Sequence, residues 1–362
     1  KQQDSWQKIS IKEKAELFAK TAQNLRKYRK DLIGVMMLDG GKTILEGDPE
    51  VSEAIDFVEY YLRSMLEMHS HKELSWDPKG IILITPPWNF PVSIPTGGIF
   101  SALAAGNCVL FKPAPEAVLS GWILVNALWE AGIPKNVLQF INCVDDPVGS
   151  QLIIDPRIHA VILTGATATA RLFMKMRPDL DLHAETGGKN ALIVTAMADR
   201  DLAIKDLVHS AFGHAGQKCS AASLGILEAE VYDDPHFLEQ LKDATESLSV
   251  GSPWDLKSKV TPLIRAPHDA LLRGLMVLED GESWLVEPKQ DLSNPNLWSP
   301  GIKLGVKPGS FMHKTELFGP VLSLMRANNL DHAIMLANQS SYGLTSGISS
   351  LDEREQKKWI KK

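Results

Sequence analysis

The sequence predicts an α/β protein in which a helical segment is followed by two sets of alternating strands and helices. Residues 11–67 have apolar side chains at helical spacing, and from residue 80 onward short β-branched runs alternate with helix-like segments. Strands that alternate with helices form parallel sheets that are covered on both faces. Because 362 residues exceed the usual size of one hydrophobic core, we expect two domains.

The expected elements follow in chain order. Helices fill residues 11–67, interrupted by GGKT at 40–43. The strands of the first set are expected at 80–85, 107–111, 137–142 and 159–164, with a further strand that ends at Glu185. The second set contains a strand at 190–194, a helix at about 199–213 and a strand at 224–229. Residues 280–310, rich in Gly, Pro, Ser and Asn, are expected to form long loops.

Composition excludes several classes of function. The chain is 44% hydrophobic and 23% charged, as in ordinary globular proteins. Its net charge of −6 leaves no excess of Lys and Arg, so we expect neither nucleic acid nor an anionic membrane as partner. No apolar run reaches the roughly 18 residues of a membrane span. Three cysteines without a C-x-x-C pair favour a reducing compartment, the cytoplasm, and small molecules are the expected ligands.

The familiar nucleotide and metal motifs are absent. There is no G-x-G-x-x-G, and GGKT (40–43) and GGKN (187–190) lack the first glycine of a P-loop, which is replaced by Met36 and His183. Neither segment therefore qualifies as a P-loop. The pair of histidines in HSH (69–71) has no Cys or carboxylate cluster to complete a site, so we expect no metal.

Cys219 lies in a polar segment, GHAGQKCSAAS, between a predicted helix and a strand. Asp199 is expected to cap this helix, and Gly216 suits the left-handed position after its end. Since a helix C-terminus disfavours a thiolate, activation of this thiol must come from other groups. Taken alone, Cys219 fits a packed small residue better than a nucleophile. Cys108 and Cys143 fall in apolar strand patterns and are expected to be core residues.

Three further segments place polar residues directly after strands. Asn89 follows the first strand in TPPWNFPVSIP, Lys112 follows the second in FKPAPEA, and Glu185 ends a later one in HAETGGKN. In one interpretation, Asn89 is a fixed amide, Lys112 is a cation at a cofactor and Glu185 is a functional carboxylate. A packed aromatic turn, a solvated lysine and a buried structural carboxylate are the alternatives.

Together these segments resemble the aldehyde dehydrogenase superfamily over nearly the whole chain. In that family the asparagine of P-W-N-F-P, a lysine after the second strand, the glutamate of E-x-G-G-K, the cysteine of G-Q-x-C and E-x-F-G-P occur in this order. Their counterparts here are Asn89, Lys112, Glu185, Cys219, and Glu316 with Phe318. The segments EVSEAIDFVEYY, HSAFGHAGQKCSA and SYGLTSGISSLD are most similar to L-glutamate γ-semialdehyde (Δ1-pyrroline-5-carboxylate) dehydrogenases, including those fused to proline dehydrogenase.

The resemblance implies NAD-dependent oxidation of an aldehyde to a carboxylic acid, with a thiohemiacetal and then a thioester on Cys219. It implies that the Asn89 amide and the Cys219 backbone N–H stabilise the oxyanion. Glu185 would act as the base that activates the deacylating water, a task for a partly buried carboxylate. The resemblance further implies that Ser220 holds a substrate carboxylate, and a turn hydroxyl is the alternative role for this residue.

The same resemblance implies a Rossmann-like NAD-binding domain with N-terminal helices at residues 1–186 and an α/β catalytic domain at 187–362. The expected cofactor contacts are Lys112 and Glu316 at the ribose hydroxyls, Phe318 at the nicotinamide and Gly165 near the pyrophosphate. Trp88 is a further expected cofactor contact. The partners that it implies are a small aldehyde, further copies of the chain and a fused or associated proline dehydrogenase.

Three departures from the family pattern leave alternatives open. Pro115 stands where many NAD-preferring relatives have a glutamate, so NADP stays an alternative cofactor. Gly98 stands where many broad-specificity members carry a lysine, and no role of that lysine is transferred. The chain is expected to end before the family's Pro-Phe-Gly-Gly substrate loop. A catalytically inactive binding module and a coenzyme A-dependent acylating enzyme are the alternative functions.

Overall fold

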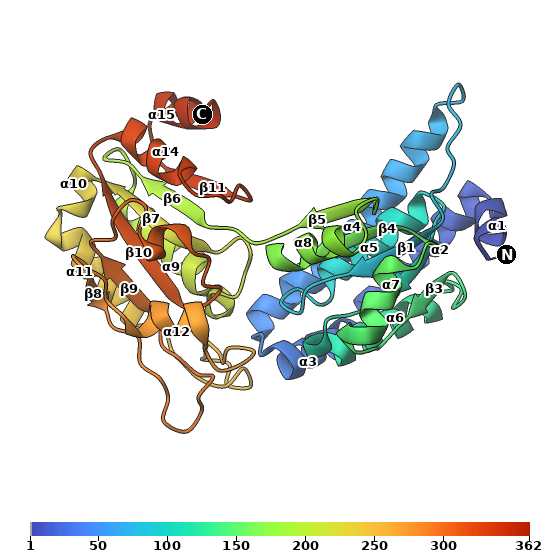
Figure 1. Cartoon of the computed structure of the whole chain (residues 1–362), viewed down its shortest axis with the longest axis horizontal. Coiled ribbons are helices and arrows are strands. Elements are labelled where there is room, and N and C mark those ends of the chain that lie inside the picture. Colours follow the sequence, from blue (N-terminus) through green and yellow to red (C-terminus); the bar gives the residue numbers. More distant parts are fainter. Residues whose placement is uncertain (1) are drawn as a thin grey trace. The chain divides into compact units, whose positions relative to one another are not determined.

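The computed structural model describes residues 2–362 and forms two compact units, which meet in the sequence between Thr186 and Gly187 (Figure 1). Each unit is built on one β-sheet with helices packed against it. The predicted α/β fold class is confirmed.

Four helices open the first unit: α1 (Gln2–Lys8), α2 (Ile11–Lys27), α3 (Arg29–Gly40) and α4 (Ile44–Ser70). A capping box starts α2, in which the Ser10 hydroxyl accepts a hydrogen bond from the Glu13 N–H at 3.2 Å and the Glu13 carboxylate accepts one from the Ser10 N–H at 3.0 Å. Gly41, at φ 67°, ends α3 in the left-handed conformation, and Thr43 is the N-cap of α4. The GGKT segment is therefore the break between two helices.

The first sheet is parallel throughout, with the strand order β3-β2-β1-β4-β5. Its strands are β1 (Ile81–Thr85), β2 (Cys108–Phe111), β3 (Leu138–Phe140), β4 (Ile158–Thr164) and β5 (Leu182–Glu185). The order reverses between β1 and β4. In open parallel sheets, ligands bind outside the carboxyl ends of the strands at such a reversal.

Both faces of this sheet are covered, because neighbouring residues of β1 point to opposite sides. Ile82 and Ile84 lie in a core with residues of α2, α4, α5 (Ser93–Ala104) and α6 (Val118–Glu130). Leu83 lies in another core with residues of α7 (Ser150–Ile154) and α8 (Thr167–Met176). Short helical turns occur at Pro115–Ala117 and Asp145–Gly149.

The sheet of the second unit has the order β11-β6-β7-β10-β9-β8, with β8 antiparallel to β9 and all other neighbours parallel. Its strands are β6 (Asn190–Val194), β7 (Ala222–Glu228), β8 (Ser283–Val286), β9 (Gly301–Leu304), β10 (Val321–Ala327) and β11 (Ser346–Ser349). Its helices are α9 (Arg200–Phe212), the turn Gly213–Gly216, α10 (Ala229–Tyr232), α11 (Pro235–Glu246), α12 (Asp269–Met276), α13 (Phe311–Lys314), α14 (Leu330–Asn338) and α15 (Glu353–Ile360). The central strands β7 and β10 are almost entirely buried, as expected of parallel strands covered on both faces.

Two expectations about local structure are wrong. Residues 280–310 contain β8 and β9, two four-residue strands whose pairing with each other and with β10 outweighs their Gly- and Pro-rich surroundings. Cys143 is half-buried in the loop after β3 and lies outside the core, whereas Cys108 is buried as expected. Among the helices of residues 2–362, none is both long and apolar enough to cross a membrane.

Candidate active site

The first unit gathers five expected site residues at the carboxyl edge of its sheet. Trp88 and Asn89 follow β1, Lys112 follows β2, Gly165 follows β4, and Glu185 is the last residue of β5. The Gly165 N–H donates to the Glu185 carbonyl at 3.1 Å, which ties the ends of β4 and β5 together. These residues therefore surround the reversal of strand order, where a ligand site is expected.

The turn that carries Asn89 is buried and strongly hydrogen-bonded. Asn89 is 3% exposed. Its carbonyl oxygen accepts a hydrogen bond from the Lys42 ammonium at 2.7 Å, and Lys42 is paired with Glu50. The Glu50 carboxylate in turn accepts from the Val92 N–H at 2.8 Å. A packed aromatic turn is thus only part of the description, because a buried ion pair holds its backbone.

Lys112 is held at the edge of the sheet. Its ammonium lies 2.7 Å from Asp145 Oδ1, and its side chain is 11% exposed whereas that of Asp145 is 75% exposed. The solvated-lysine interpretation is therefore wrong. The charge is fixed close to the ends of β1 and β2.

Glu185 differs from the expectation of a partly buried carboxylate, because it is exposed. The reason is its position on β5, an edge strand that pairs only with β4 among the described strands. The whole of β5 is exposed or half-buried. The alternative of a buried structural carboxylate is wrong for the same reason.

In the second unit the expected residues lie at the amino edge of the sheet, before the first residues of β6, β7 and β10. In the first unit they lie at the carboxyl edge. The strands β6, β7 and β10 are neighbours, so the segments before them meet. The Asn190 side-chain amide donates to the carbonyl of Cys219 at 2.6 Å and to that of Ala221 at 2.9 Å. The Gly188 N–H donates to Glu316 Oε1 at 2.9 Å. Cys219 and Glu316 are thus brought to one edge by contacts with the segment 187–190.

The loop that carries Cys219 is packed more tightly than its small residues suggest. Asp199 caps α9 by accepting a hydrogen bond from the Leu202 N–H at 3.0 Å, as expected. The helix ends at Phe212, so Gly216 does not directly follow it as expected, but the expected left-handed conformation of Gly216 is confirmed. Gly216 has φ 70° because it closes a further turn, and a Cβ there would collide with the carbonyl group of Gly319.

Cys219 is half-buried and Ser220 is exposed. The segment before them is anchored by Gln217, which is 1% exposed. Its amide nitrogen donates to the His214 carbonyl at 3.2 Å, and its amide oxygen accepts from the Ile264 N–H at 2.9 Å. The thiol is therefore carried by a loop whose backbone is fixed on both sides.

A buried lysine next to Glu316 changes the electrostatics of this edge. Burial lowers the pKa of Lys189 to about 7, although the nearby Glu316 carboxylate opposes the shift and Lys303 adds to it. Burial raises the pKa of Glu316, while the hydrogen bond from Gly188 and the charge of Lys189 act against it. Phe318, two residues later, has φ 57°, a strained conformation for a residue with a side chain.

Four residues of these networks were missed by the sequence, namely Lys42, Glu50, Lys189 and Asn190. Three of them stand in the GGKT and GGKN segments, which the sequence marks as unusual without giving them a role. The hydrogen-bond partners of Lys42, Glu50 and Asn190 are 8 to 47 residues away in the chain, so no local pattern reveals these contacts.

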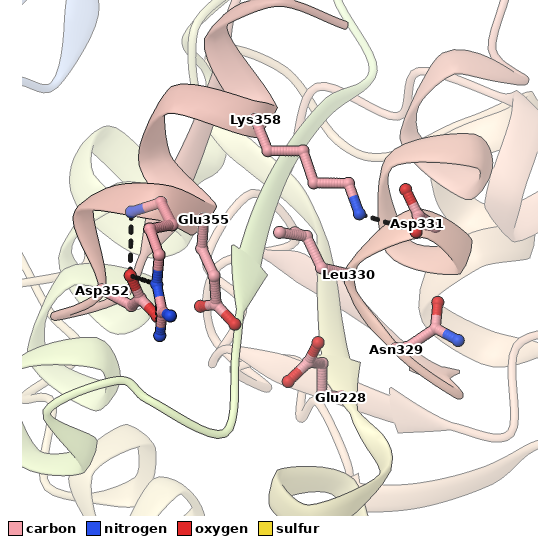
Figure 2. A pocket seen from close by; sticks show the side chains of 8 residues that line it. Glu228, Asn329, Leu330, Asp331, Asp352, Glu355 and Lys358 are labelled. Atoms are coloured by element: carbon pink, nitrogen blue, oxygen red, sulfur yellow. Dashed lines mark hydrogen bonds and ion pairs between the residues drawn. The ribbon is translucent and has the colours of Figure 1, made fainter.

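A separate hollow lies at the other end of the second sheet (Figure 2). It is lined by Glu228, the last residue of β7, and by residues of α14 and α15. Lys358 and Asp331 pair across it at 2.7 Å, so much of its charge is neutralised within the chain. None of the expected site residues lines it. Within residues 2–362, no group of three His, Cys, Asp or Glu side chains is placed to hold a metal ion.

The sequence of all 362 residues matches the family model described as the aldehyde dehydrogenase family. The chain belongs to the aldehyde dehydrogenase family. It is 33% identical, over a 376-residue alignment, to the 1-pyrroline-5-carboxylate dehydrogenase of Staphylococcus haemolyticus, and the match covers 99% of this chain and 72% of that protein. The resemblance inferred from the motifs is thereby confirmed, and so is the expectation that the chain is an enzyme of this type.

Two solved structures match the chain over nearly its whole length. Proline utilization A (PutA) from Corynebacterium freiburgense is 46% identical with a TM-score of 0.94, and the match covers 99% of this chain and 37% of that one. The 1-pyrroline-5-carboxylate dehydrogenase from Thermus with bound NAD is 31% identical with a TM-score of 0.91, covering 99% of this chain and 73% of that one. The chain thus spans little more than a third of the PutA chain and about three quarters of the other two relatives.

Proposed function

We propose that this chain oxidises L-glutamate γ-semialdehyde to L-glutamate with NAD as the hydride acceptor. The observation that carries the proposal is the position of Cys219, a half-buried thiol on a fixed loop at the edge where Glu316 is held by Gly188. Thiolates are the strongest nucleophiles among side chains near neutral pH, and aldehydes are electrophiles. In this proposal the first unit binds the cofactor and the second carries the nucleophile.

Cys219 begins the reaction as a thiolate that forms a bond from Sγ to the aldehyde carbon. The carbonyl electron pair moves to oxygen, and the Asn89 amide and the Cys219 backbone N–H donate hydrogen bonds to that oxyanion. NAD, when bound, supplies the acceptor for the hydride that leaves as the carbonyl re-forms. The product on the enzyme is a thioester of Cys219.

Hydrolysis of the thioester is assigned to Glu185. Its carboxylate accepts a proton from a water molecule whose oxygen attacks the thioester carbon. Collapse of that adduct breaks the carbon–sulfur bond, so that the acid departs and the Cys219 thiolate is restored. Glu185 is exposed, so its carboxylate is accessible to a water molecule.

The residues present fit NAD. The Glu316 carboxylate receives the Gly188 N–H on Oε1, and among residues 2–362 no hydrogen bond to its Oε2 is found, so this oxygen can accept from a ribose hydroxyl. Lys112 would meet the ribose from the first unit. Trp88, Gly165 and Phe318 are assigned to the cofactor as well. Pro115 provides no carboxylate against a 2′-phosphate, so NADP is the alternative cofactor to be compared.

The substrate is proposed from the relatives and from Ser220. The Staphylococcus and Thermus relatives carry the name 1-pyrroline-5-carboxylate dehydrogenase. Ser220 is exposed directly beside Cys219, where its hydroxyl can donate to the carboxylate of a semialdehyde. The similarity to PutA supports a proline dehydrogenase as fused or associated partner. We further place the enzyme in the cytoplasm as a homo-oligomer.

The test is NADH formation by the full-length protein with a panel of aldehydes that includes glutamate γ-semialdehyde. We expect the highest kcat/KM for this substrate, and loss of turnover in Cys219→Ser with little change in NAD affinity. Cys143→Ser, which alters a half-buried cysteine of the first unit, is the matched control and should keep full activity. Near wild-type turnover in Cys219→Ser would refute the proposal, and product formation only with coenzyme A would favour the acylating alternative.

A further inference from the structure

We propose that the buried ion pair of Lys42 and Glu50 is the positioning device for Asn89, and that it acts by clamping the backbone of the P-W-N-F-P turn. This inference rests on the proposed function of Asn89 as an oxyanion donor. Lys42 and Glu50 are positioning residues, because they act through Asn89 and are not expected to touch the substrate.

The lysine half of the clamp holds the turn at Asn89 itself. The side chains of Lys42 and Glu50 are 2% and 0% exposed, and the ammonium contacts Glu50 Oε2 directly. The same ammonium donates to the Asn89 carbonyl oxygen at 2.7 Å and lies 3.9 Å from the centre of the Phe90 ring. One buried charge therefore fixes two consecutive residues of the turn.

The glutamate half holds the turn where it enters α5. Glu50 Oε1 accepts hydrogen bonds from the Val92 N–H at 2.8 Å and the Ser93 N–H at 3.2 Å. Backbone N–H groups at a helix start have no partner within the helix, and a carboxylate there is favourable. Both oxygens of Glu50 are thus engaged, one by Lys42 and the other by the backbone three and four residues after Asn89.

The GGKT segment directs Lys42 into the interior, where it pairs with Glu50. Gly41, at φ 67°, turns the chain between α3 and α4, and Lys42 follows it into the interior. In a P-loop the corresponding lysine would meet a phosphate, whereas here it meets a peptide carbonyl. A buried ion pair is weak as a source of stability, because desolvation offsets much of its attraction. The role of this ion pair is better explained by the backbone geometry of the turn that it fixes.

The expected consequence is kinetic. Without the ammonium, the Asn89 carbonyl and the Glu50 charge lose a shared partner, and the backbone that carries the Asn89 amide loses its constraint. Misplacement of a catalytic group by about 1 Å can cost on the order of 10²-fold in rate. We expect Lys42→Met to slow the NADH burst by roughly 10- to 100-fold, with NAD affinity changed less than about threefold.

A double-mutant cycle tests the inference in the full-length protein. The NADH burst is measured by rapid mixing in wild type, Lys42→Met, Asn89→Ala and the double variant. If Lys42 acts through Asn89, its replacement in the Asn89→Ala background should cost less than about threefold, because the amide that it positions is already absent. The same 10- to 100-fold loss in both backgrounds would overturn the inference.

Lys14→Met is the matched control, since Lys14 is a buried lysine of the same unit (3% exposed) that lies against Trp6. It should leave the burst unchanged; an equal loss there would overturn the inference.

If Lys42→Met does not fold, Glu50→Gln replaces it in the cycle with the same expected result. If neither variant folds, the inference is overturned and the pair serves the fold alone. If Asn89→Ala alone slows the NADH burst by less than tenfold, the proposed oxyanion role of Asn89 is contradicted. This outcome differs from equal losses for Lys42→Met in both backgrounds, which contradict only the positioning role of Lys42.

Discussion

Glu316 lies so close to Gly187 that there is no room for a side chain on this residue. A Cβ on Gly187 would collide with the Glu316 carboxylate. Gly187→Ala should therefore displace this carboxylate and weaken NAD binding by about tenfold or more, the scale of one lost hydrogen bond to a charged group. Titration of the protein with NAD measures the effect. Gly343→Ala, where a Cβ meets no atom within 4 Å in the same unit, is the control and should bind NAD normally.

Lys189 predicts a pH dependence of stability. Burial lowers the pKa of Lys189 to about 7 in the folded protein, against an ordinary value of 10.5. Between these values the unfolded chain binds the proton and the folded chain does not, so the free energy of unfolding gained from this group rises with pH. The contribution is complete above about pH 10.5 and is lost as the pH falls to about 7.

Urea unfolding of wild type and Lys189→Met between about pH 7.5 and 9.5 measures this contribution. The difference in unfolding free energy, wild type minus variant, should increase with pH. Lys205→Met removes an exposed lysine on α9 and should show no such increase. A pH-independent difference for Lys189→Met would contradict the assignment.

At the residue scale, the sequence located side chains whose identity is local and missed those whose role depends on distant partners. Asn89, Lys112 and Glu185 stand at strand ends that the apolar runs predict. The contact of Lys42 with Asn89 spans 47 residues, and that of Asn190 with Cys219 spans 29. Such contacts exist only once the sheets are assembled. The exposure of Glu185 was missed for the same reason, since it depends on β5 being an edge strand.

At the scale of elements, α9 leads into the loop of Cys219, and its start is set by Asp199. Asp199→Ala removes the acceptor for the Leu202 N–H and should lower the unfolding free energy by about 1 kcal/mol. Asp199→Asn keeps an acceptor oxygen and should lose much less. Chemical denaturation of wild type and the two variants measures these unfolding free energies. Equal losses of unfolding free energy in the two variants would contradict a capping role.

The predicted strands of both sheets agree with the structure to within about two residues where they are apolar and buried. The sequence missed four strands: β8 and β9 occupy residues predicted as loops, and no strand was predicted at β10 or β11. Both β8 and β9 have four residues, and β8 lies at the edge of the second sheet. Propensity is a weak guide for such strands, because their stability comes from cross-strand pairing and not from their own side chains.

At the scale of the whole molecule, the alternation of strands and helices predicts two parallel-sheet units but not the order of strands within them. The order β3-β2-β1-β4-β5 places the ends of β1 and β4 side by side, and this reversal gathers Asn89 and Gly165 at one edge. In the second unit the neighbouring strands β6, β7 and β10 gather Cys219 and Glu316 at their amino ends. The motifs name the residues, and the strand orders explain why they meet within each unit.

The central claim is that Cys219 carries the acyl group and Glu185 releases it. Glu185→Gln cannot accept a proton from water, so the full-length variant mixed with glutamate γ-semialdehyde and NAD should give a burst of up to one NADH per site. Turnover after the burst should fall by roughly 10²- to 10⁴-fold. Mass spectrometry of the quenched protein should then find the glutamyl thioester on the peptide that contains Cys219. Unchanged steady turnover with no added mass on that peptide would contradict the account.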